Sequence, residues 1–447
     1  MRKDFRSFLA LLEENGELRR VGMETDVRFV SATIAKSREA LLFERLTGYD
    51  MTLAGGLLNT RRRLALAMGT DPSEVARALA FGVANPVPPE IVSSGPVKEV
   101  IKVGDEVDLT ELPIPLFHEE DGGPYITGGI GVVKDPKVGR NAGVYRLMFR
   151  TKNETGIDLV SLRDTRTLYQ QALLQGRPLE FASVIGVHPL DMIAAAYKAP
   201  FGFDEFGIAG GLQRCPVPLV HCETVDIEVP ADAEIVLEGE ILPIGWVEPE
   251  GPFGEFNRMQ GEIHYNPVVR IKAITHRRDP IFYALHMPLE NNWLLAPGIE
   301  CAALRALENA KLIPHQVSVL PGASCYYSLI ASIRNKNPGE GKNALMALLS
   351  IADVKMAVVT DDDVDIYDRD EVDWALTFRV QADEDVLIVR GARGDPADPS
   401  VKRWLLPPGV MPTTAKLGID ATVPEGVPRT KYEHPRYCYI DDIGSGA

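Results

Sequence analysis

Glu250-Gly-Pro-Phe-Gly-Glu255 is the stretch around which the rest of the chain is organised. Pro252 fixes its own φ and the flanking glycines free the backbone, so the stretch predicts a shaped turn and not a helix or regular strand. Such a turn can aim both carboxylates into one cavity, where their pKa values are pushed apart and one serves as base and one as acid. The alternative interpretation is a solvated acidic loop, because acidic turns are common.

A second stretch, Asn141-Ala-Gly-Val-Tyr-Arg146, raises the odds of a functional site. It places an amide and a guanidinium on a predicted strand. An arginine beside two glutamates indicates a site that handles a carboxylate, because a guanidinium presents paired donors to a carboxylate.

The region around these two stretches, from about residue 97 to 274, is β-rich. Gly128-Gly-Ile-Gly lacks a following helix, so it is a poor dinucleotide fingerprint. Many short strands with few helices predict a barrel that holds a ligand. The predicted strands lie at 132–133, 144–149, 159–162, 181–187, 217–220, 235–237 and 268–273, with a short helix at 191–196.

Both flanks of this region mix helices with strands. On the N-terminal side we expect helices at 5–15, 32–47 and 71–81, a strand at 51–53, and a solvated turn at Arg61-Arg62-Arg63. On the C-terminal side, a helix at 298–312 leads to alternating strands and helices typical of an α/β layer. There Asp361-Asp-Asp363 follows a predicted strand. Such a run of aspartates is more often a turn with helix-capping acids than a metal site, so we favour the turn.

Composition excludes some classes of partner. The chain has 447 residues and a net charge of −16, which argues against nucleic acid or an anionic membrane surface as a partner. Its five cysteines have no zinc spacing and no CxxC pair, which fits a reducing cytoplasm. We see no signal peptide and no apolar run that could span a bilayer, so the expected location is cytoplasmic.

Four more motifs join these two stretches, and the six follow one another along the chain: Asn141-x-x-x-Tyr145-Arg146, Glu205-Phe-Gly-Ile-Ala-Gly210, Glu234-Ile-Val-Leu-Glu-Gly239, Glu250-Gly-Pro-Phe-Gly-Glu255, Asp361-Asp-Asp-Val364 and Lys416-Leu-Gly-Ile-Asp-Ala-Thr422. Together they resemble the UbiD family of prenylated-FMN-dependent decarboxylases, over nearly the whole chain. The resemblance implies a mixed α/β fold with an N-terminal α/β domain (1–110), a split β-barrel that binds prenylated FMN (111–297), a linker helix (298–312) and a C-terminal α/β oligomerisation domain with a tail (313–447).

The resemblance also implies roles for three residues. Arg146 would hold the substrate carboxylate bidentately, Glu255 would deliver the proton that replaces CO2, and Glu250 would orient Arg146 and tune Glu255. The chemistry of decarboxylation calls for the same groups, since the carbon that loses CO2 needs a nearby acid and an electron sink.

The cofactor set follows from the resemblance as well. Asn141, Asp164 and Glu205 match positions that hold a divalent metal against the flavin phosphate, although Asp164 stands where a histidine is often found. An all-oxygen set favours Mg²⁺ or Mn²⁺, and the added negative charge makes a monovalent cation, K⁺, more needed. Tyr145, Arg163 and Lys416 are the other expected cofactor contacts; a surface lysine is the alternative for Lys416.

The substrate is less defined by the sequence. By position, Leu289-Glu-Asn-Asn-Trp-Leu-Leu295 would line the substrate pocket, and its apolar Trp293 and Leu295 suit a flat unsaturated or aromatic monoacid more than a diacid. His286 is a candidate polar contact, although a lone histidine beside a buried strand is more often a satisfied core residue.

The leading hypothesis is therefore a non-oxidative, reversible decarboxylase of an aromatic, heteroaromatic or α,β-unsaturated carboxylic acid. We expect a homodimer or higher homo-oligomer and a flavin prenyltransferase as cofactor supplier. The runner-up is an ordinary FMN-dependent oxidoreductase, which would not need Arg146 with both glutamates. A glycosidase is disfavoured because both acids sit on one short turn. A non-catalytic assembly partner would require a broken set of these residues, and the set is intact.

Overall fold

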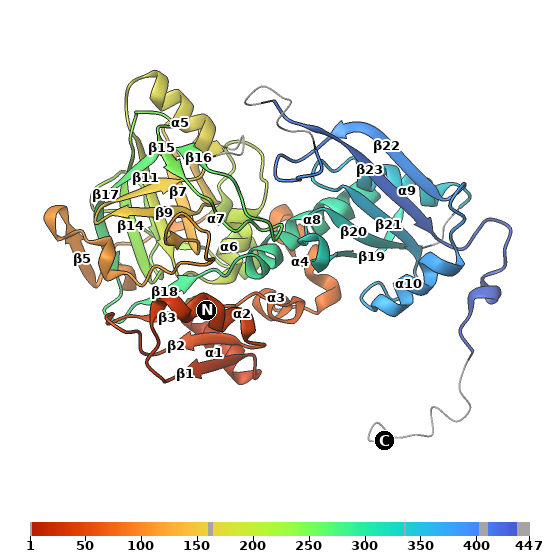
Figure 1. The fold of residues 1–447 in the computed structure, drawn as a ribbon, viewed down its shortest axis with the longest axis horizontal. Helices are drawn as coiled ribbons and strands as arrows, with labels where there is room; N and C mark the ends of the chain where they lie inside the picture. The colour runs from red at the N-terminus through yellow and green to blue at the C-terminus, as the bar shows by residue number, and fades with distance from the viewer. Residues whose placement is uncertain (1, 160–163, 335–336, 402–409, 436–447) are drawn as a thin grey trace. The chain divides into compact units, whose positions relative to one another are not determined.

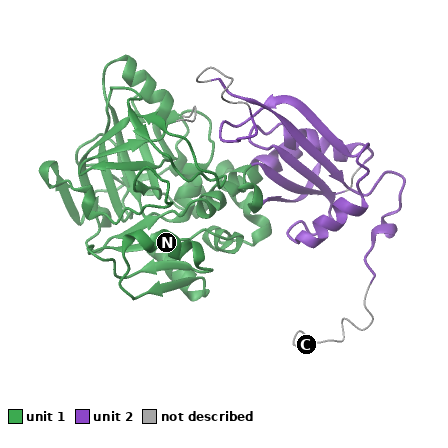
Figure 2. Cartoon of the chain, in the orientation of Figure 1, with its two compact units in different colours: residues 1–301, 321–326 green, residues 302–320, 327–447 purple. Residues whose placement is uncertain are grey.

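The computed structural model describes residues 2–159, 164–334, 337–401 and 410–435. The chain forms two compact units, one of residues 1–301 with 321–326 and one of residues 302–320 with 327–447 (Figures 1 and 2). Both units combine helices with sheets, so the mixed α/β class that the sequence predicts is confirmed. In the described part of the chain, no helix is both long and apolar enough to cross a membrane.

A four-stranded sheet with the order β1-β2-β3-β18 forms the N-terminal part of the first unit. Its strands are β1 (Leu18–Val21), β2 (Ala40–Phe43), β3 (Thr52–Gly55) and β18 (Ile281–Ala284), and its helices are α1 (Phe5–Glu14), α2 (Val30–Lys36), α3 (Arg61–Met68) and α4 (Val75–Ala84). Helix α1 begins at a capping box made by Asp4 and Ser7, and it buries the apolar face that its spacing predicts. Strand β18 comes from the sequence region predicted to belong to the barrel.

Two predictions for this part of the chain are wrong. The helix expected over 32–47 ends at Lys36, because Ala40-Leu-Leu-Phe43 is buried on both faces as a strand between β1 and β3. The turn expected at Arg61-Arg62-Arg63 is instead the start of α3, capped by the Thr60 side chain. The Arg63 side chain is 1% exposed, and its guanidinium donates hydrogen bonds to Glu17 and to the Gly56 carbonyl. Arg63 is therefore buried and paired, whereas its charge suggested that it would be solvated.

A curled nine-stranded sheet forms the centre of the first unit, as the predicted barrel requires (Figure 1). Its order is β6-β9-β10-β17-β14-β11-β7-β8, with β5 on β17. Each strand in this order pairs antiparallel with its neighbours, and β5 also pairs antiparallel with β17. The strands are β5 (Val100–Val103), β6 (Tyr125–Ile126), β7 (Gly129–Asp135), β8 (Gly139–Val144), β9 (Leu147–Thr151), β10 (Glu154–Ile157), β11 (Leu179–Ile185), β14 (Ile235–Ile241) and β17 (Val268–His276).

Along the chain, helices and smaller sheets alternate with the strands of the central sheet or follow them. The helices are α5 (Asp164–Leu174), α6 (Pro189–Ala196), α7 (Glu205–Gln213) and α8 (Leu289–Asn309). Helix α6 confirms the predicted short helix, whereas α5 and α7 were not predicted, and α8 starts at Leu289 instead of 298. The small sheets join β4 (Glu90–Ile91), β12 (Pro218–His221) and β13 (Glu228–Pro230), and pair β15 (Glu248–Glu250) with β16 (His264–Asn266).

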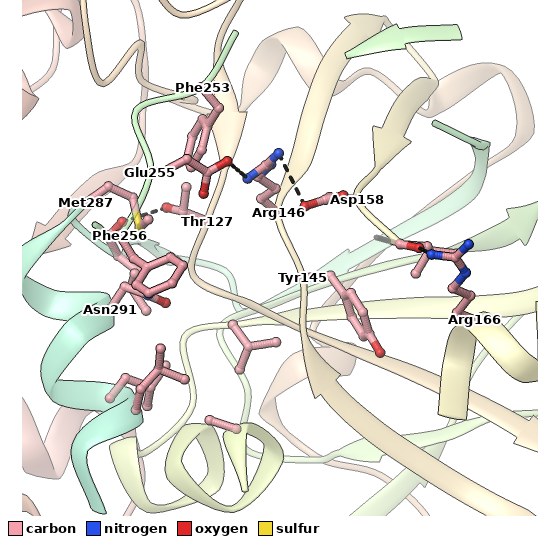
Figure 3. Close-up of a pocket in the computed structure, with 16 residues that line it drawn as sticks. Thr127, Tyr145, Arg146, Asp158, Arg166, Phe253, Glu255, Phe256, Met287 and Asn291 are labelled. Carbon is pink, nitrogen blue, oxygen red and sulfur yellow. Dashed lines mark hydrogen bonds and ion pairs between the residues drawn. The ribbon is translucent and has the colours of Figure 1, made fainter. Parts of the chain in front are cut away.

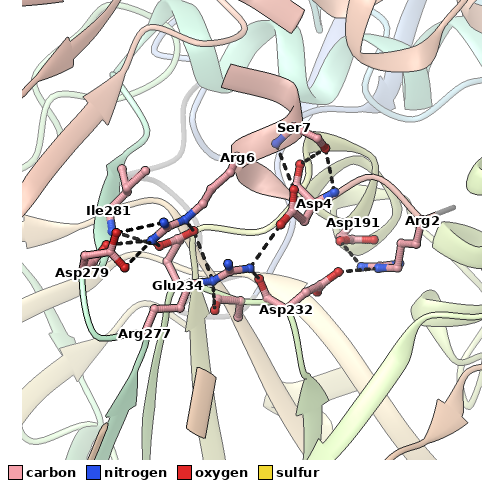
Figure 4. A network of polar contacts seen from close by, with 11 residues as sticks. Arg2, Asp4, Arg6, Ser7, Asp191, Asp232, Glu234, Arg277, Asp279 and Ile281 are labelled. Atoms are coloured by element: carbon pink, nitrogen blue, oxygen red, sulfur yellow. Dashed lines mark hydrogen bonds and ion pairs between the residues drawn. The ribbon is translucent and has the colours of Figure 1, made fainter. Parts of the chain in front are cut away.

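An ion-pair network ties the N-terminal segment to helix α6 and to loops beside strands β14 and β17 of the central sheet (Figure 4). Arg6 donates to both oxygens of buried Glu234, at 2.8 and 2.9 Å, and Arg2 contacts Asp191 at 2.6 Å and Asp232 at 2.7 Å. Arg277 donates to the Asp4 carboxylate that caps α1. Each buried acid of this network therefore has a guanidinium partner, which is the arrangement that makes a buried carboxylate tolerable.

The second unit contains a five-stranded sheet with the order β19-β20-β21-β23-β22. Its elements are β19 (Ile313–Val319), β20 (Ser328–Arg334), α9 (Glu340–Leu349), β21 (Met356–Asp361), α10 (Arg369–Phe378), β22 (Val386–Arg393) and β23 (Thr413–Ala421). The predicted alternation is confirmed. The acids after β21 pair with Arg379, which contacts Asp363 at 2.9 Å, and Asp361 accepts a bond from the Val423 amide. These contacts support the turn interpretation of Asp361-Asp-Asp363.

Candidate active site

The turn predicted from Glu250-Gly-Pro-Phe-Gly-Glu255 joins the end of β15 to a loop of the first unit. Gly251 has a φ of +95°, a conformation that residues with a Cβ rarely adopt, so the turn requires glycine there. The imidazole of His118 lies where a Cβ on Gly254 would sit, and the Gly254 amide donates to Asp121 at 2.8 Å. These contacts fix the turn and leave Glu250 and Glu255 on the same side of it, as the predicted pairing of the acids requires.

Arg146 contacts both glutamates, and Figure 3 shows it between Glu255 and a third acid, Asp158. Its Nε and Nη2 donate to the two oxygens of Glu250 at 2.9 and 3.1 Å, and its Nη1 donates to Glu255 Oε1 at 2.9 Å. Its Nη2 also lies 3.2 Å from Asp158 Oδ2, and its guanidinium stacks 4.5 Å from the centre of the Phe253 ring. One cation with three carboxylates carries a net negative charge when all are ionised, so the cluster favours binding of a proton at one of them.

Glu255 has a pKa that favours its protonated form. Burial raises its pKa above the ordinary glutamate value, Arg146 opposes this rise, and the charges of Asp158 and Glu250 add to it. Its side chain is 19% exposed, whereas Glu250 is 1% exposed and is held at both oxygens by Arg146. The two glutamates therefore have different surroundings: Glu250 anchors the guanidinium, and Glu255 can exchange a proton with a molecule in the cavity.

A cavity of about 230 Å³ opens beside this cluster. Tyr145 lies against Gly131 and Gly143, where an added Cβ would meet its ring within 2.7 and 2.8 Å, so two strand glycines make room for the ring on the sheet. The remaining walls are mostly apolar. The cavity is lined by Thr127, Val144, Tyr145, Arg146, Asp158, Leu159, Arg166, Ala196, Phe253, Glu255, Phe256, Leu285, Met287, Asn291, Leu294 and Leu295.

Two of the three predicted oxygen ligands, Asn141 and Glu205, are in contact, and the third, Asp164, accepts from the Gly202 amide and lies near enough for its charge to act on Glu205. The Asn141 amide donates to Glu205 Oε1 at 3.1 Å, and the Ala142 amide donates to Glu205 Oε2 at 2.8 Å. Burial raises the pKa of Glu205 to about 8, and the Asp164 charge contributes to the rise. Asn141 is buried and accepts a bond from Thr165 at 2.9 Å. A buried carboxylate with an amide oxygen and a second carboxylate nearby is a donor set that fits a hard divalent cation.

Other predicted site residues lie in different surroundings. His286 is buried, with Nε2 3.1 Å from the Ser31 carbonyl, and neither His286 nor Trp293 lines the described cavity, whereas Leu295 does. The Lys416 ammonium is buried in the second unit, where it donates to the carbonyls of Leu349, Ile351 and Ala352. Arg163 lies outside the described residues. The functional assignments of these five residues stay predictions.

Asp158 and Arg166 line the cavity although the sequence analysis did not select them. Asp158 directly follows β10, and its signal is an acid inside the apolar run Gly156-Ile-Asp-Leu-Val160. Arg166 lies on α5 and donates to the Leu159 carbonyl at 3.1 Å. It is three residues from Arg163, for which a cofactor contact was predicted, and its helix was not predicted.

Comparisons with known families match almost the whole chain. Three family descriptions of 3-octaprenyl-4-hydroxybenzoate carboxy-lyase apply: the N-terminal domain to residues 9–81, the Rift-related domain to residues 90–288 and the C-terminal domain to residues 293–421. Anhydromevalonate phosphate decarboxylase of Methanothermobacter thermautotrophicus is 34% identical over 407 residues, which are 90% of this chain and 93% of the relative. The enzyme of the same name from Methanosarcina mazei is 34% identical over 94% of this chain and 96% of the relative.

Solved structures give the same match. The UbiD-class enzyme HmfF of Pelotomaculum thermopropionicum, solved in complex with FMN, has a TM-score of 0.92 and 39% identity and covers 99% of both chains. The apo 3,4-dihydroxybenzoic acid decarboxylase AroY of Klebsiella pneumoniae has a TM-score of 0.90 and 27% identity over 98% of this chain and 97% of its own. The matched ranges therefore span the part of the chain that builds the cavity and the cluster around Arg146.

Proposed function

Because this chain belongs to the UbiD family of carboxy-lyases, we propose that its cavity decarboxylates an aromatic, heteroaromatic or α,β-unsaturated monocarboxylic acid without net oxidation. The observation that carries the proposal is Arg146 held between Glu250 and Glu255 at the cavity wall. The apolar remainder of the lining suits a flat carbon skeleton, and the acids beside Arg146 disfavour a second anionic group on the substrate.

The residues divide the work as follows. Arg146 binds the substrate carboxylate, and Glu250 holds the guanidinium in place from its far side at two nitrogens. Since Arg146 donates to Oε1 of Glu255, the acidic proton of Glu255 sits on Oε2. That proton is transferred to the carbon that has lost CO2, and the raised pKa of Glu255 keeps it available. Apolar walls exclude competing water.

Prenylated FMN is the proposed cofactor, and it supplies the electron sink that the carbon needs when CO2 leaves. Asn141, Glu205 and Asp164 would hold a divalent cation, Mn²⁺ or Mg²⁺, which in turn would hold the flavin phosphate, with K⁺ as the monovalent cation. The support is the burial of Glu205, whose carboxylate has two amide donors and no cationic partner among the described residues. Tyr145, which lines the cavity, would contact the flavin.

We also propose a homo-oligomer that receives its cofactor from a flavin prenyltransferase and works in the cytoplasm. An evolved dimeric form of the related HmfF has been solved with prFMN, which supports assembly of this chain and the choice of flavin. The cysteines that the structure describes, at 215, 222, 301 and 325, form no disulfide, which agrees with a reducing compartment.

The test is CO2 release from a panel of cinnamic-type, benzoic-type and heteroaromatic acids by protein co-expressed with a flavin prenyltransferase. We expect CO2 from at least one acid with no consumption of NAD(P)H. No CO2 from any acid, together with NAD(P)H oxidation, would move the assignment to the alternative, an ordinary FMN-dependent oxidoreductase. A mass measurement of the released flavin serves as the loading control.

A further inference from the structure

Helix α8 begins at the wall of the cavity, and its second residue is a buried glutamate. Residues 285–295, which lead into α8 and form its first turns, contribute five of the 16 residues that line the cavity: Leu285, Met287, Asn291, Leu294 and Leu295. We call residues 285–295 the α8 wall. In Figure 3, Met287 and Asn291 lie together on the side of the cavity away from Arg166. Glu290 belongs to the α8 wall, but it is 0% exposed and does not line the cavity.

The Glu290 carboxylate accepts hydrogen bonds from five donors. The amide of His286 and the hydroxyl of Tyr283 each donate to it at 2.8 Å. The other three donors are successive main-chain amides between β3 and α3, at 2.7–3.1 Å: Gly56, Leu57 and Leu58. Because main-chain amides cannot accept, both oxygens of Glu290 have to act as acceptors, and a carboxylate offers about four lone-pair sites for this purpose.

These bonds attach the α8 wall to other parts of the first unit. The Glu290 amide donates to the His286 carbonyl at 3.0 Å while the His286 amide donates to the Glu290 carboxylate, so Glu290 closes the segment that precedes the helix. Thr127 Oγ1 donates to the carbonyl of Leu285 at 2.8 Å. The carboxylate of Glu290 therefore links the α8 wall to the loop between β3 and α3.

A second buried glutamate of α8 is held differently. Glu300 is also 0% exposed, and it pairs with Arg61 at 2.6 Å, outside the cavity lining. Glu290 has no cationic partner among the residues that the structure describes, and its donors are the amides and the hydroxyl named above. A buried acid without a cation is costly for folding, and such departures from pairing are expected near functional sites.

From these contacts we infer that Glu290 is a positioning residue for substrate binding, because it holds the α8 wall against which the carbon skeleton of the acid lies. The inference rests on the proposed function, since it takes this cavity to be the place where the acid binds. Glu290 acts through the wall and does not touch the acid. A displaced wall weakens binding of the acid more than it affects proton transfer from Glu255, which lies on a different segment.

The experiment measures KM and kcat of the flavin-loaded holoprotein, with the acid of the panel that releases CO2 fastest. The proteins are wild type, Glu290→Gln, Tyr283→Phe and the control Glu300→Gln, all below their unfolding transitions. Glu290→Gln keeps the volume but has one acceptor oxygen, so main-chain amides at the other atom lose their acceptor. Tyr283→Phe removes one donor and keeps the ring. Amide hydrogen exchange of the α8 wall is measured in parallel, without the acid.

Glu290→Gln is expected to raise KM about 10-fold or more, since misplacement of a positioning group can cost up to about 100-fold. Its kcat should change less than about threefold, because the lost binding is shared by substrate and transition state. Tyr283→Phe should raise KM by a smaller factor. Glu300→Gln should lower the Tm, because Arg61 loses its partner, and leave KM unchanged. Exchange in the α8 wall should become faster in Glu290→Gln and not in Glu300→Gln.

A wild-type KM in folded Glu290→Gln, or equal changes of KM and exchange in Glu290→Gln and Glu300→Gln, overturns the inference. If Glu290→Gln does not fold, Tyr283→Phe decides, and an unchanged KM in that variant overturns the inference. If wild type releases no CO2 from any acid, the proposed function fails by itself. Faster exchange confined to the α8 wall of Glu290→Gln would then still support Glu290 as the residue that positions this wall.

Discussion

Two clusters of buried acids in the first unit differ in one respect, the presence of a cation. Around Arg146, three carboxylates share one guanidinium that contacts each of them within 3.2 Å. Around Asn141, the donors to the Glu205 carboxylate among the described residues are two amides, and its pKa rises to about 8 because it is buried. The first cluster contains its own cation, whereas the second has the composition of a site that obtains one from solution.

The N-terminal network shows what the chain does with buried acids that serve only the fold. There Asp191, Asp232 and Glu234 are each paired with an arginine at 2.6–2.8 Å. Against this reference, the cluster around Arg146 has more acids than cations, and Glu205 has no cationic contact among the residues that the structure describes. Both departures from pairing are costly for folding, and such departures are expected at functional sites.

The strongest way to break the comparison is to remove the acid that exchanges a proton. Glu255→Gln keeps the volume and one acceptor for Arg146 but cannot deliver a proton, so CO2 release should fall about 10²–10⁴-fold while flavin binding is retained. Glu248→Gln is the matched control, since Glu248 is nearby, half exposed and outside the cavity lining. Near-wild-type turnover by Glu255→Gln would remove Glu255 as the proton donor.

The next prediction concerns the cation of the first cluster. Arg146→Lys keeps the charge but loses the fork that bonds Glu250 at two nitrogens and presents paired donors to a carboxylate, so we expect turnover to fall about 10²–10³-fold. Arg150→Lys serves as the control, because Arg150 lies on neighbouring β9 and pairs with Glu248 outside the cavity. Comparable steady-state rates for Arg146→Lys and wild type would reduce Arg146 to a structural partner of wall carboxylates.

The second cluster is tested by metal and flavin content. Asp164→Ala and Glu205→Gln should each lower the affinity for a divalent metal by about 10–100-fold, the loss that is typical even of residues that only support a metal ligand. Flavin occupancy should fall together with the metal affinity. Elemental analysis and flavin absorbance of purified variants are the measurements. Glu240→Gln, which alters an acid paired with Lys272, is the control. Unchanged metal and flavin in the Asp164 variant would take Asp164 out of the site.

The smallest effect is a pH dependence of stability in metal-free protein. The pKa of Glu205 is about 8 in the fold against an ordinary value of 4.5, so the folded state holds a proton that the unfolded state loses between these values. The stability contributed by protonated Glu205 is therefore complete below about pH 4.5 and is lost as the pH rises to about 8.

Thermal unfolding of metal-free wild type and Glu205→Gln between pH 5 and pH 8 measures this term. The wild type should lose more stability over this range than the variant, and added Mn²⁺ should abolish the difference at pH 8. Parallel pH curves for the two proteins would show that Glu205 does not carry the unpaired charge.

The sequence predicted much of this site because short-range chemistry decided it. The positive φ at Gly251 follows from the Gly-Pro-Phe-Gly spacing, and Arg146, Glu250 and Glu255 meet as expected. Burial decided the failures: Ala40–Phe43 and Arg63 take conformations set by the sheet around them and not by local propensity. Asp158 was missed because its role depends on the pairing of β9 with β10 next to Arg146, which no local pattern specifies.

The most direct test of the central claim follows the proton. Wild-type protein loaded with prenylated FMN is given an accepted acid in D2O, and CO2 and the deuterium at the former carboxyl-bearing carbon are quantified by mass spectrometry. If Glu255 delivers a solvent-exchanged proton to that carbon, each CO2 released is accompanied by one deuterium, and Glu255→Gln lowers both together. Release of CO2 without deuterium at that carbon, or oxidation of the acid with no hydrogen replacing the carboxyl group, would contradict the account.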